Sequence, residues 1–316
     1  MSNKKQPLIV LSGPTSAGKT ALSIRLAKRI GGEIISADSM QVYRHMDIGT
    51  AKIKPAETEG VPHYLIDCLT PDREFNVSVF RDMAEHAIET IQANGHIPIV
   101  AGGTGFYIQA LLKGVSFDEE DRSDGYRHML EQISAEPDGE EKLFSMLHEV
   151  DPESCRTIPK QNKKRVIRAL EFAHCHGFPI SVHNKESAAS KPRYNYAYFV
   201  LTKDREELYL GINRRVDEMM KAGLLTEVKE LVRLGYGDCT VAMQGLGYKQ
   251  LLMHLRGECT LEEAVDRIKQ ETRHFAKRQM TWFRREKDVI FYNRSNLSED
   301  EILEDMLKIL KEKAIV

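Results

Sequence analysis

Short apolar runs alternate with amphipathic stretches over the first hundred residues of the chain. Each run is four to seven residues long and partly β-branched, as buried strands are. The stretches between them repeat apolar side chains every three or four positions, which is the period of a helix with one buried face. We predict strands at residues 8–11, 33–37, 63–69 and 97–100, and helices at 21–30 and 76–94. Strands that alternate with helices indicate a parallel sheet with helices on both faces.

The alternation stops near residue 115 and resumes near residue 193. Between them no strand is predicted, and the pattern indicates helices at 125–134, 140–150 and 160–176, followed by a polar hinge at 181–192. The last part of the chain predicts strands at 196–201 and 289–292 and a helix at 211–223. A capping box of Thr260 and Glu263 begins a helix that extends as far as Glu286, and Ser298 with Glu301 caps a closing helix. We therefore predict an α/β core formed by residues 1–115 and 193–316, with an inserted all-helical subdomain at 116–192.

The first predicted strand leads directly into the segment Gly13-Pro14-Thr15-Ser16-Ala17-Gly18-Lys19-Thr20, and the first helix follows it. A G-x-x-x-x-G-K-T segment between a strand and a helix is the pattern of a phosphate-binding P-loop. Its glycines let the backbone curl, so that several N–H groups and the helix N-terminus face one anion. Lys19 adds a positive charge, and the Thr20 hydroxyl can bind Mg²⁺. The motif predicts a sheet of the P-loop NTPase type and a polyphosphate ligand, without saying which polyphosphate.

Two further polar segments follow predicted strands. Asp38 comes directly after the second strand, and Gly102-Gly103-Thr104-Gly105 follows the strand at 97–100. In a doubly wound sheet the residues beyond the carboxyl ends of the strands surround the ligand, so we expect Asp38 and Thr104 near the P-loop. Asp38 then suits a catalytic or metal-shell carboxylate; a carboxylate that caps a turn is the alternative. A simple tight turn is the alternative for the glycine-rich segment.

Positive charge is concentrated in two stretches of a chain whose net charge is only −2. The first lies on the helix predicted at 160–176 and contains Lys160, Lys163, Lys164, Arg165 and Arg168, with no acid between residues 154 and 170. The second, residues 267–287, contains eight Lys or Arg, two acids and several aromatic residues. A solvated helix face is the ordinary explanation of such a stretch. In the first stretch the density and single sign of the charges favour contact with nucleic acid phosphates instead. In the second, bases and aromatic residues at helical spacing suit a helix with one face in the core and the other facing phosphates.

Composition narrows the remaining possibilities. The 316 residues are 41% hydrophobic and 29% charged, as expected of a soluble globular protein. The five cysteines include no C-x-x-C pair, which indicates reduced thiols in the cytosol. The neighbours His174-Cys175-His176 point in different directions on a helix, which argues against a metal site. No apolar run reaches the ~18 residues of a membrane span, and residues 1–6 are polar, so we predict a cytoplasmic protein without a membrane partner.

Seven segments, taken in this order, make the chain resemble the tRNA dimethylallyltransferases, also called tRNA isopentenyl transferases, over essentially its whole length. The segments are Gly13-Pro14-Thr15-Ser16-Ala17-Gly18-Lys19-Thr20, Asp38-Ser39-Met40-Gln41-Val42-Tyr43, Gly49-Thr50-Ala51-Lys52, Ala101-Gly102-Gly103-Thr104-Gly105-Phe106-Tyr107, Lys164-Arg165-Val166-Ile167-Arg168-Ala169-Leu170-Glu171, Gly245-Leu246-Gly247-Tyr248-Lys249 and Arg278-Gln279-Met280-Thr281-Trp282-Phe283-Arg284. Ser16-Ala17 replaces the more common Ala-Ser of the family P-loop, which exchanges two small residues. The sequence lacks the C-terminal zinc finger of eukaryotic members, so an enzyme of the bacterial type is expected.

The resemblance implies a reaction and a set of residues for it. A dimethylallyl group passes from dimethylallyl diphosphate to the exocyclic N6 amine of the tRNA adenine on the 3′ side of the anticodon, and diphosphate is released. By similarity, Asp38 takes a proton from the amine and Thr104 helps to hold the reacting groups. The diphosphate would bind where related P-loops hold ATP, with Mg²⁺ at Thr20. The implied diphosphate-binding residues are Gly13, Pro14, Thr15, Ser16, Ala17, Gly18, Lys19, Thr20 and Arg215.

The resemblance also implies tRNA contacts in two parts of the chain. The insertion would face the anticodon stem-loop through Arg127, Gln161, Asn162, Lys163, Lys164 and Arg165. The core would contribute Asp38, Ser39, Met40, Gln41, Thr104, Gly245, Gly247, Tyr248 and Lys249. The basic composition of the helix at 160–176 supports the contacts there better than it supports the contact of Arg127. The target adenine must leave its stack in the anticodon loop to reach the site. We expect the protein to be a monomer.

Three other functions could use the same P-loop. A small-molecule kinase would bind ATP there, but it has little use for two basic stretches and a large insertion. A non-catalytic RNA-binding ATPase would leave Asp38 and Thr104 without a role. An adenylate isopentenyltransferase, which prenylates free nucleotides, would have the same catalytic residues, so only the stretches that face tRNA distinguish it.

Overall fold

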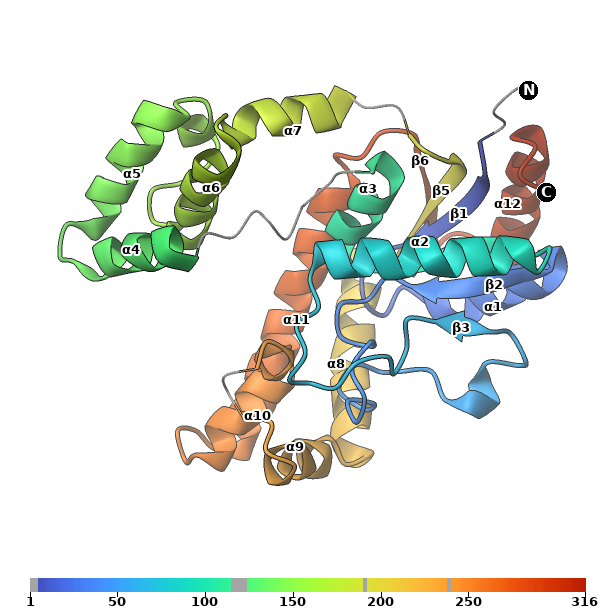
Figure 1. The fold of residues 1–316 in the computed structure, drawn as a ribbon. Helices are drawn as coiled ribbons and strands as arrows, with labels where there is room; N and C mark the ends of the chain where they lie inside the picture. Colours follow the sequence, from blue (N-terminus) through green and yellow to red (C-terminus); the bar gives the residue numbers. More distant parts are fainter. Residues whose placement is uncertain (1–4, 115–123, 190–191, 238–239) are drawn as a thin grey trace. The chain divides into compact units, whose positions relative to one another are not determined.

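The computed structural model describes residues 5–114, 124–189, 192–237 and 240–316 (Figure 1). The chain divides into two compact units. The larger one, here called the core, comprises Met1–Leu112 and Arg193–Val316, and the smaller one, here called the helical unit, comprises Lys113–Pro192. The boundary that we predicted between residues 115 and 116 lies outside the described residues.

One sheet of six parallel strands organises the described part of the core. The strand order is β3-β2-β4-β1-β5-β6, so β1 lies in the interior of the sheet. Ile9 of β1 lies opposite Ile99 of β4 on one side and Ala197 of β5 on the other. The strands are β1 (Pro7–Ser12), β2 (Gly32–Ser36), β3 (His63–Tyr64), β4 (Ile97–Gly102), β5 (Asn195–Thr202) and β6 (Val289–Asn293). The predicted parallel α/β fold is confirmed.

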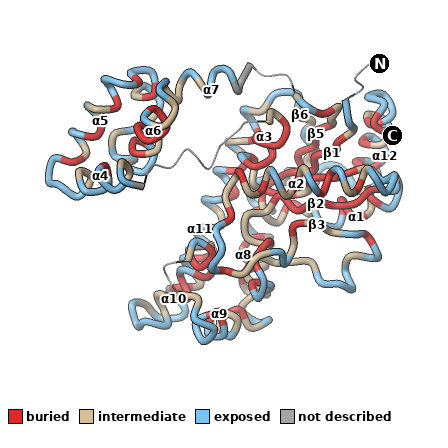
Figure 2. Tube along the Cα trace, viewed as in Figure 1, coloured by how far each residue is buried: buried red, intermediate tan, exposed pale blue. Residues whose placement is uncertain are grey.

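Helices cover both faces of this sheet. Leu8 and Val10 point to one face and Ile9 and Leu11 to the other, because successive side chains of a strand alternate. Side chains of α2 and α3 pack on the first face, and those of α1 and α12 on the second, so that the strands are buried (Figure 2). The core helices are α1 (Lys19–Ile30), α2 (Val77–Ala93), α3 (Gly105–Lys113), α8 (Arg205–Lys221), α9 (Leu224–Arg233), α10 (Tyr248–Leu255), α11 (Leu261–Phe283) and α12 (Glu299–Glu312). Short 3₁₀ turns occupy Pro55–Glu57 and Ala242–Gln244.

Helices α8 to α11 extend the first apolar layer away from the sheet. Val216, Leu224, Leu251 and Ile268, one from each helix, belong to the same buried cluster as the first-face side chains of β1. The longest helix, α11, begins at the predicted capping box, in which the Thr260 hydroxyl accepts a hydrogen bond from a backbone N–H. Among the described residues, every helix is too short or too polar to cross a membrane.

The helical unit has an apolar interior of its own. Leu130, Leu143, Leu147, Val166 and Leu170 are almost fully buried against one another. Its elements are α4 (Asp124–Ala135), α5 (Gly139–Val150), a 3₁₀ turn (Ser154–Arg156), α6 (Lys163–His176) and α7 (Ile180–Ala189). Side chains of α4, α5 and α6 bury one another, so this unit has a hydrophobic core without a β-sheet.

Two predictions of local structure are wrong. The strand predicted at 63–69 ends after Tyr64, because Leu65 and Asp67 have φ angles of 61° and 54°, which an extended strand excludes. The hinge predicted at 181–192 is largely the helix α7, whose sequence has no apolar stripe at helical spacing. Periodicity therefore gave no signal for it. The sequence also failed to predict α3, α9 and α10, which are only 9, 10 and 8 residues long.

Candidate active site

The P-loop connects β1 to α1 in a conformation that glycines make possible. Gly13 and Gly18 have φ angles of 145° and 87°. A Cβ atom on Gly13 would lie 2.4 Å from the carbonyl oxygen of Leu201, and one on Gly18 would collide with the Arg294 guanidinium. Gly18 also precedes the first turn of α1 without a capping side chain. The N–H groups at the start of this helix are therefore left for an anion.

Lys19 is held over the P-loop by backbone groups. Its half-buried Nζ donates to the carbonyl oxygens of Gly13 and Pro14 at 3.0 and 2.8 Å. The pKa of Lys19 is lowered to about 8, because burial and then the positive charge of Arg215 lower it more than the negative charge of Asp38 raises it. The ammonium group is thus poorly solvated and close to a second cation, which is a setting that an incoming polyanion would stabilise.

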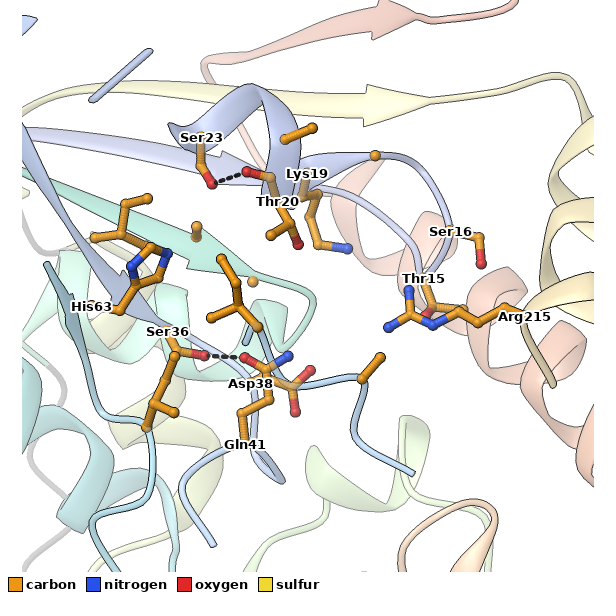
Figure 3. A pocket seen from close by; sticks show the side chains of 18 residues that line it. Thr15, Ser16, Lys19, Thr20, Ser23, Ser36, Asp38, Gln41, His63 and Arg215 are labelled. Carbon is orange, nitrogen blue, oxygen red and sulfur yellow. Dashed lines mark hydrogen bonds between the residues drawn. The ribbon is translucent and has the colours of Figure 1, made fainter. Parts of the chain in front are cut away.

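Asp38 and Arg215 face the same space from different elements (Figure 3). Asp38 follows β2, and its Oδ1 accepts a hydrogen bond from the backbone N–H of Met40 at 2.9 Å. Arg215 extends from α8, and burial lowers the pKa of its guanidinium while Asp38 and Glu218 raise it. In the described part of the chain Arg215 has no hydrogen bond or salt bridge. The structure therefore leaves the Arg215 guanidinium available to a ligand.

Two adjoining cavities meet at these side chains. The first, here called the P-loop cavity, has a volume of about 380 Å³ and is lined by Lys19, Thr20, Ser36, Gln41 and Gly102, among others. The second, here called the α8–α11 cavity, has about 400 Å³ and is lined by Thr104, Ile212, Val216, Met219, Ile268 and Phe275, among others. Thr15, Ser16, Asp38 and Arg215 line both. A polar cavity thus adjoins a more apolar one, and both volumes suit small-molecule sites.

Thr104 and its glycine neighbours lie close to the P-loop, as predicted for the carboxyl ends of neighbouring strands. The backbone N–H of Thr104 donates to the carbonyl of Ala37, directly before Asp38, at 3.2 Å. A Cβ atom on Gly103 would lie 2.3 Å from Nε2 of Gln279. The glycine at this position therefore allows the backbone to approach a side chain of α11.

Sequence reasoning did not single out Gln279 as a site residue. Its amide donates to the Gly103 carbonyl at 2.9 Å and accepts from the Thr15 N–H at 3.2 Å, which ties α11 to the P-loop. Phe275 and Arg278 line the α8–α11 cavity beside it. The sequence signals for these residues were the dense charge of residues 267–287 and the family segment 278–284, and neither says which side of a helix faces a cavity.

Most of the core residues expected to contact tRNA border the two cavities. Ser39, Met40, Gly245, Gly247 and Tyr248 line the α8–α11 cavity. Tyr248 is almost fully buried there, and its hydroxyl donates to a carboxylate of α9.

Gln41 and Lys249 differ from that group. Gln41 lines the P-loop cavity, where its amide accepts from the Ser36 hydroxyl at 3.0 Å and donates to the Thr50 carbonyl at 3.3 Å. Lys249 is exposed and lines neither cavity.

The candidate residues of the helical unit divide into paired and exposed side chains. Arg127 lies 3.1 Å from the fully buried carboxylate of Glu171 and so forms an ion pair within the unit, where it partly balances a buried charge. The Asn162 side chain caps α6, and Lys163 donates to the Ser134 carbonyl at 2.7 Å. Gln161, Lys164 and Arg165 are exposed, as Asn162 is, and no ion pair of the two cations is found among the described residues.

The residues at the P-loop cavity fit a Mg²⁺ ion. Thr20 is exposed at the cavity and presents a hydroxyl, and Asp38 presents a carboxylate to the same space (Figure 3). Mg²⁺ prefers oxygen ligands, and it typically takes one or two from the protein and the rest from substrate phosphates and water. Two oxygen-bearing side chains beside an anion-binding loop supply that kind of donor set.

Comparisons with known proteins agree over nearly the whole chain. A family model described as IPP transferase matches residues 41–286. A tRNA dimethylallyltransferase of Lachnoclostridium phytofermentans is 55% identical over 312 residues, which cover 98% of this chain and 99% of the relative. The solved tRNA isopentenylpyrophosphate transferase of Bacillus halodurans matches with a TM-score of 0.74 and 40% identity, over 98% and 97% of the two chains. A eukaryotic dimethylallyltransferase, solved acting on tRNA, gives 0.80 and 30%, over 91% of this chain and 74% of its own.

Proposed function

The chain belongs to the IPP transferase family, and we propose that it transfers a dimethylallyl group from dimethylallyl diphosphate to the N6 amine of the tRNA adenine on the 3′ side of the anticodon. In this reaction N6 attacks C1 of the dimethylallyl group and the C1–O bond breaks. Diphosphate leaves with the bonding electrons, and the amine loses a proton. The site must therefore supply positive charge at one end and a proton acceptor at the other.

The P-loop cavity suits the diphosphate. Lys19 and Arg215 face it with charges that burial makes costly, so a bound polyanion would stabilise both. The free N–H groups at the start of α1 add a partial positive charge. Mg²⁺ held by the Thr20 hydroxyl, with its other ligands from the diphosphate and water, would neutralise further charge on the leaving group and leave Asp38 for the proton. These interactions strengthen as the C1–O bond breaks, which is the condition for lowering the barrier.

The α8–α11 cavity suits the flipped adenine. Its lining combines apolar side chains from α8 and α11, such as Val216 and Phe275, with the Thr104 hydroxyl. Phe275 offers an aromatic face for stacking. An adenine in this cavity and a diphosphate in the other would place the reacting atoms near Asp38, which lines both. Asp38 would then accept the N6 proton, because Met40 holds one of its oxygens and leaves the carboxylate facing the cavity.

We assign tRNA binding outside the cavities to the exposed end of α6. Lys164 and Arg165 are exposed, and their positive charges suit the phosphates of the anticodon stem. Arg127 already forms an ion pair within the helical unit, so its contact with tRNA is the weaker proposal.

The observation that carries this function is the meeting of a P-loop cavity and a more apolar cavity of about 400 Å³ at one carboxylate, that of Asp38. To test it, purified protein is mixed with Mg²⁺, labelled dimethylallyl diphosphate and an unmodified tRNA with adenine 3′ to its anticodon, without ATP. We expect label to enter the tRNA and free diphosphate to accumulate in equal amount. Transfer only to free AMP in a parallel tube would indicate the nucleotide-prenylating relative. Absence of transfer in both tubes, from folded protein, would contradict the proposal.

A further inference from the structure

One carboxylate of the core takes no part in the proposed chemistry, yet four donors converge on it. Glu227, in the first turn of α9, accepts hydrogen bonds from the backbone N–H groups of Asp47, Ile48 and Gly49 at 2.9, 2.7 and 3.1 Å. The hydroxyl of Tyr248 donates to the same carboxylate at 2.7 Å. Hydrogen bonds to an ionised acceptor are stronger than those between neutral groups. Glu227 therefore holds three consecutive backbone amides and one phenol in place.

The groups that Glu227 holds are packed against each other. A Cβ atom on Gly49 would lie 2.5 Å from Cζ of Tyr248, so the ring lies directly over the glycine backbone. Tyr248 is 1% exposed, and burial together with Glu227 raises the pKa of its phenol, which stays a hydrogen-bond donor. The loop and the ring thus form one assembly with Glu227 between them.

This assembly is a wall of the α8–α11 cavity. Gly49, Thr50 and Tyr248 line that cavity, whereas Glu227 lies behind them. None of the four groups that donate to Glu227 belongs to a residue described as lining the P-loop cavity. A change at Glu227 would therefore act directly on the α8–α11 cavity, and on the P-loop cavity only indirectly, through the bond from Gln41 to the Thr50 carbonyl and through the neighbouring Ala51.

We infer that Glu227 is a positioning residue, which fixes the loop at 47–50 and Tyr248 as the wall against which the tRNA adenine is placed. This inference rests on the proposed function. Glu227 acts through the residues that it holds and touches neither substrate. It should accordingly govern the reaction with tRNA and have little effect on the binding of dimethylallyl diphosphate.

The test is the variant Glu227→Gln, which keeps the shape of the side chain but turns one acceptor oxygen into a donor facing N–H groups. We expect kcat/KM for tRNA to fall about 10- to 100-fold, since charge-assisted hydrogen bonds are lost. The Kd for dimethylallyl diphosphate with Mg²⁺, measured without tRNA, should stay within about twofold of wild type. Tyr248→Phe removes one donor of the four and should lower kcat/KM for tRNA by less than about tenfold.

A matched control comes from the same helix. Glu230 is exposed and pairs with Arg233, so Glu230→Gln should leave both quantities unchanged. Thermal unfolding of each variant shows whether it is folded at the assay temperature. An unchanged kcat/KM for tRNA in Glu227→Gln would overturn the inference, and so would an equal loss of affinity for both substrates, which indicates a general structural role. Failure of the proposed activity would be visible separately, as absence of transfer by the wild-type protein.

Discussion

At the scale of residues, the site contains two positive side chains, Lys19 and Arg215, and one negative side chain near both of them, Asp38. Lys19 and Arg215 both have a pKa lowered by burial, and Asp38 is the carboxylate that opposes this effect on each of them. A bound diphosphate would supply the missing negative charge. Two properties of the site can therefore be tested directly. A change of pH tests the protonation of Lys19, and a single substitution tests the role of the Asp38 carboxylate.

The pH dependence of substrate binding follows from Lys19. Its pKa of about 8 in the free protein should rise when diphosphate binds, because an anion favours the charged amine. Below that pH the amine is already protonated and affinity does not depend on it. Above it, binding takes up a proton, so Kd for dimethylallyl diphosphate should rise by up to about tenfold per pH unit. Titrations between about pH 7 and 10 measure this, and Lys19→Arg should flatten the rise because Arg stays charged.

Asp38→Asn should separate catalysis from binding. The amide oxygen of Asn can still accept the hydrogen bond from Met40, so the turn is preserved, but the proton acceptor is lost. We expect kcat for transfer to tRNA to fall about 10²- to 10⁴-fold, as for loss of a general base, with little change in tRNA affinity. Single-turnover rates and equilibrium tRNA binding measure the two effects. Asp82→Asn, at an exposed carboxylate of α2 that lines neither cavity, is the control. An equal loss of rate and tRNA affinity in Asp38→Asn would contradict the role as base.

At the scale of elements, α11 contacts both the P-loop and the turn after β4. Gln279 makes this connection with its two amide atoms, one to Thr15 and one to Gly103. Residues on the same helix, including Phe275, line the α8–α11 cavity. A shift of α11 would consequently alter both cavities together.

Gln279→Leu tests this connection. The variant leaves the Thr15 N–H and the Gly103 carbonyl without their partner, and an unsatisfied buried polar group costs about 1–3 kcal/mol. We expect the free energy of unfolding to fall by at least that amount and the KM for dimethylallyl diphosphate to rise. Chemical denaturation and steady-state kinetics measure these changes. Gln270 lies exposed on the same helix, so Gln270→Leu should change neither quantity.

At the scale of the whole molecule, attraction for tRNA depends on local positive charge and not on the net charge of the chain. The net charge of −2 gives the protein no overall attraction for RNA. The exposed pair Lys164 and Arg165, on α6 of the helical unit, is therefore expected to supply local attraction.

The double variant Lys164→Ala/Arg165→Ala should weaken tRNA binding at low salt and make it less dependent on salt. Each lost phosphate contact reduces the slope of log K against log salt concentration by just under one, so the slope should fall by about one to two. Affinity for dimethylallyl diphosphate should not change. Lys308→Ala/Lys311→Ala, on the exposed face of α12, is a control of equal charge. An unchanged salt dependence in the α6 variant would remove these two residues from the RNA interface.

The features that could be predicted from the sequence depend on near neighbours in the chain. The P-loop was recognisable because a strand, a glycine-rich turn and a helix follow one another within residues 7–30. The capping boxes at Thr260 and Ser298 were predicted for the same reason. Alternation of strands with helices was sufficient to predict the parallel sheet, and Asp38 was placed near the P-loop by the rule that ligands bind at the carboxyl ends of strands.

The tertiary structure decided what packing brings together over long separations. Thr15 and Gln279 are 264 residues apart in the chain, and only the packing of α11 beside the P-loop makes them partners. In the same way, Glu227 holds a loop about 180 residues before it. The sequence carried the local motifs because hydrogen bonds within a turn or helix link near neighbours. Which side chains share a cavity depends on how distant helices pack, and no local pattern encodes that arrangement.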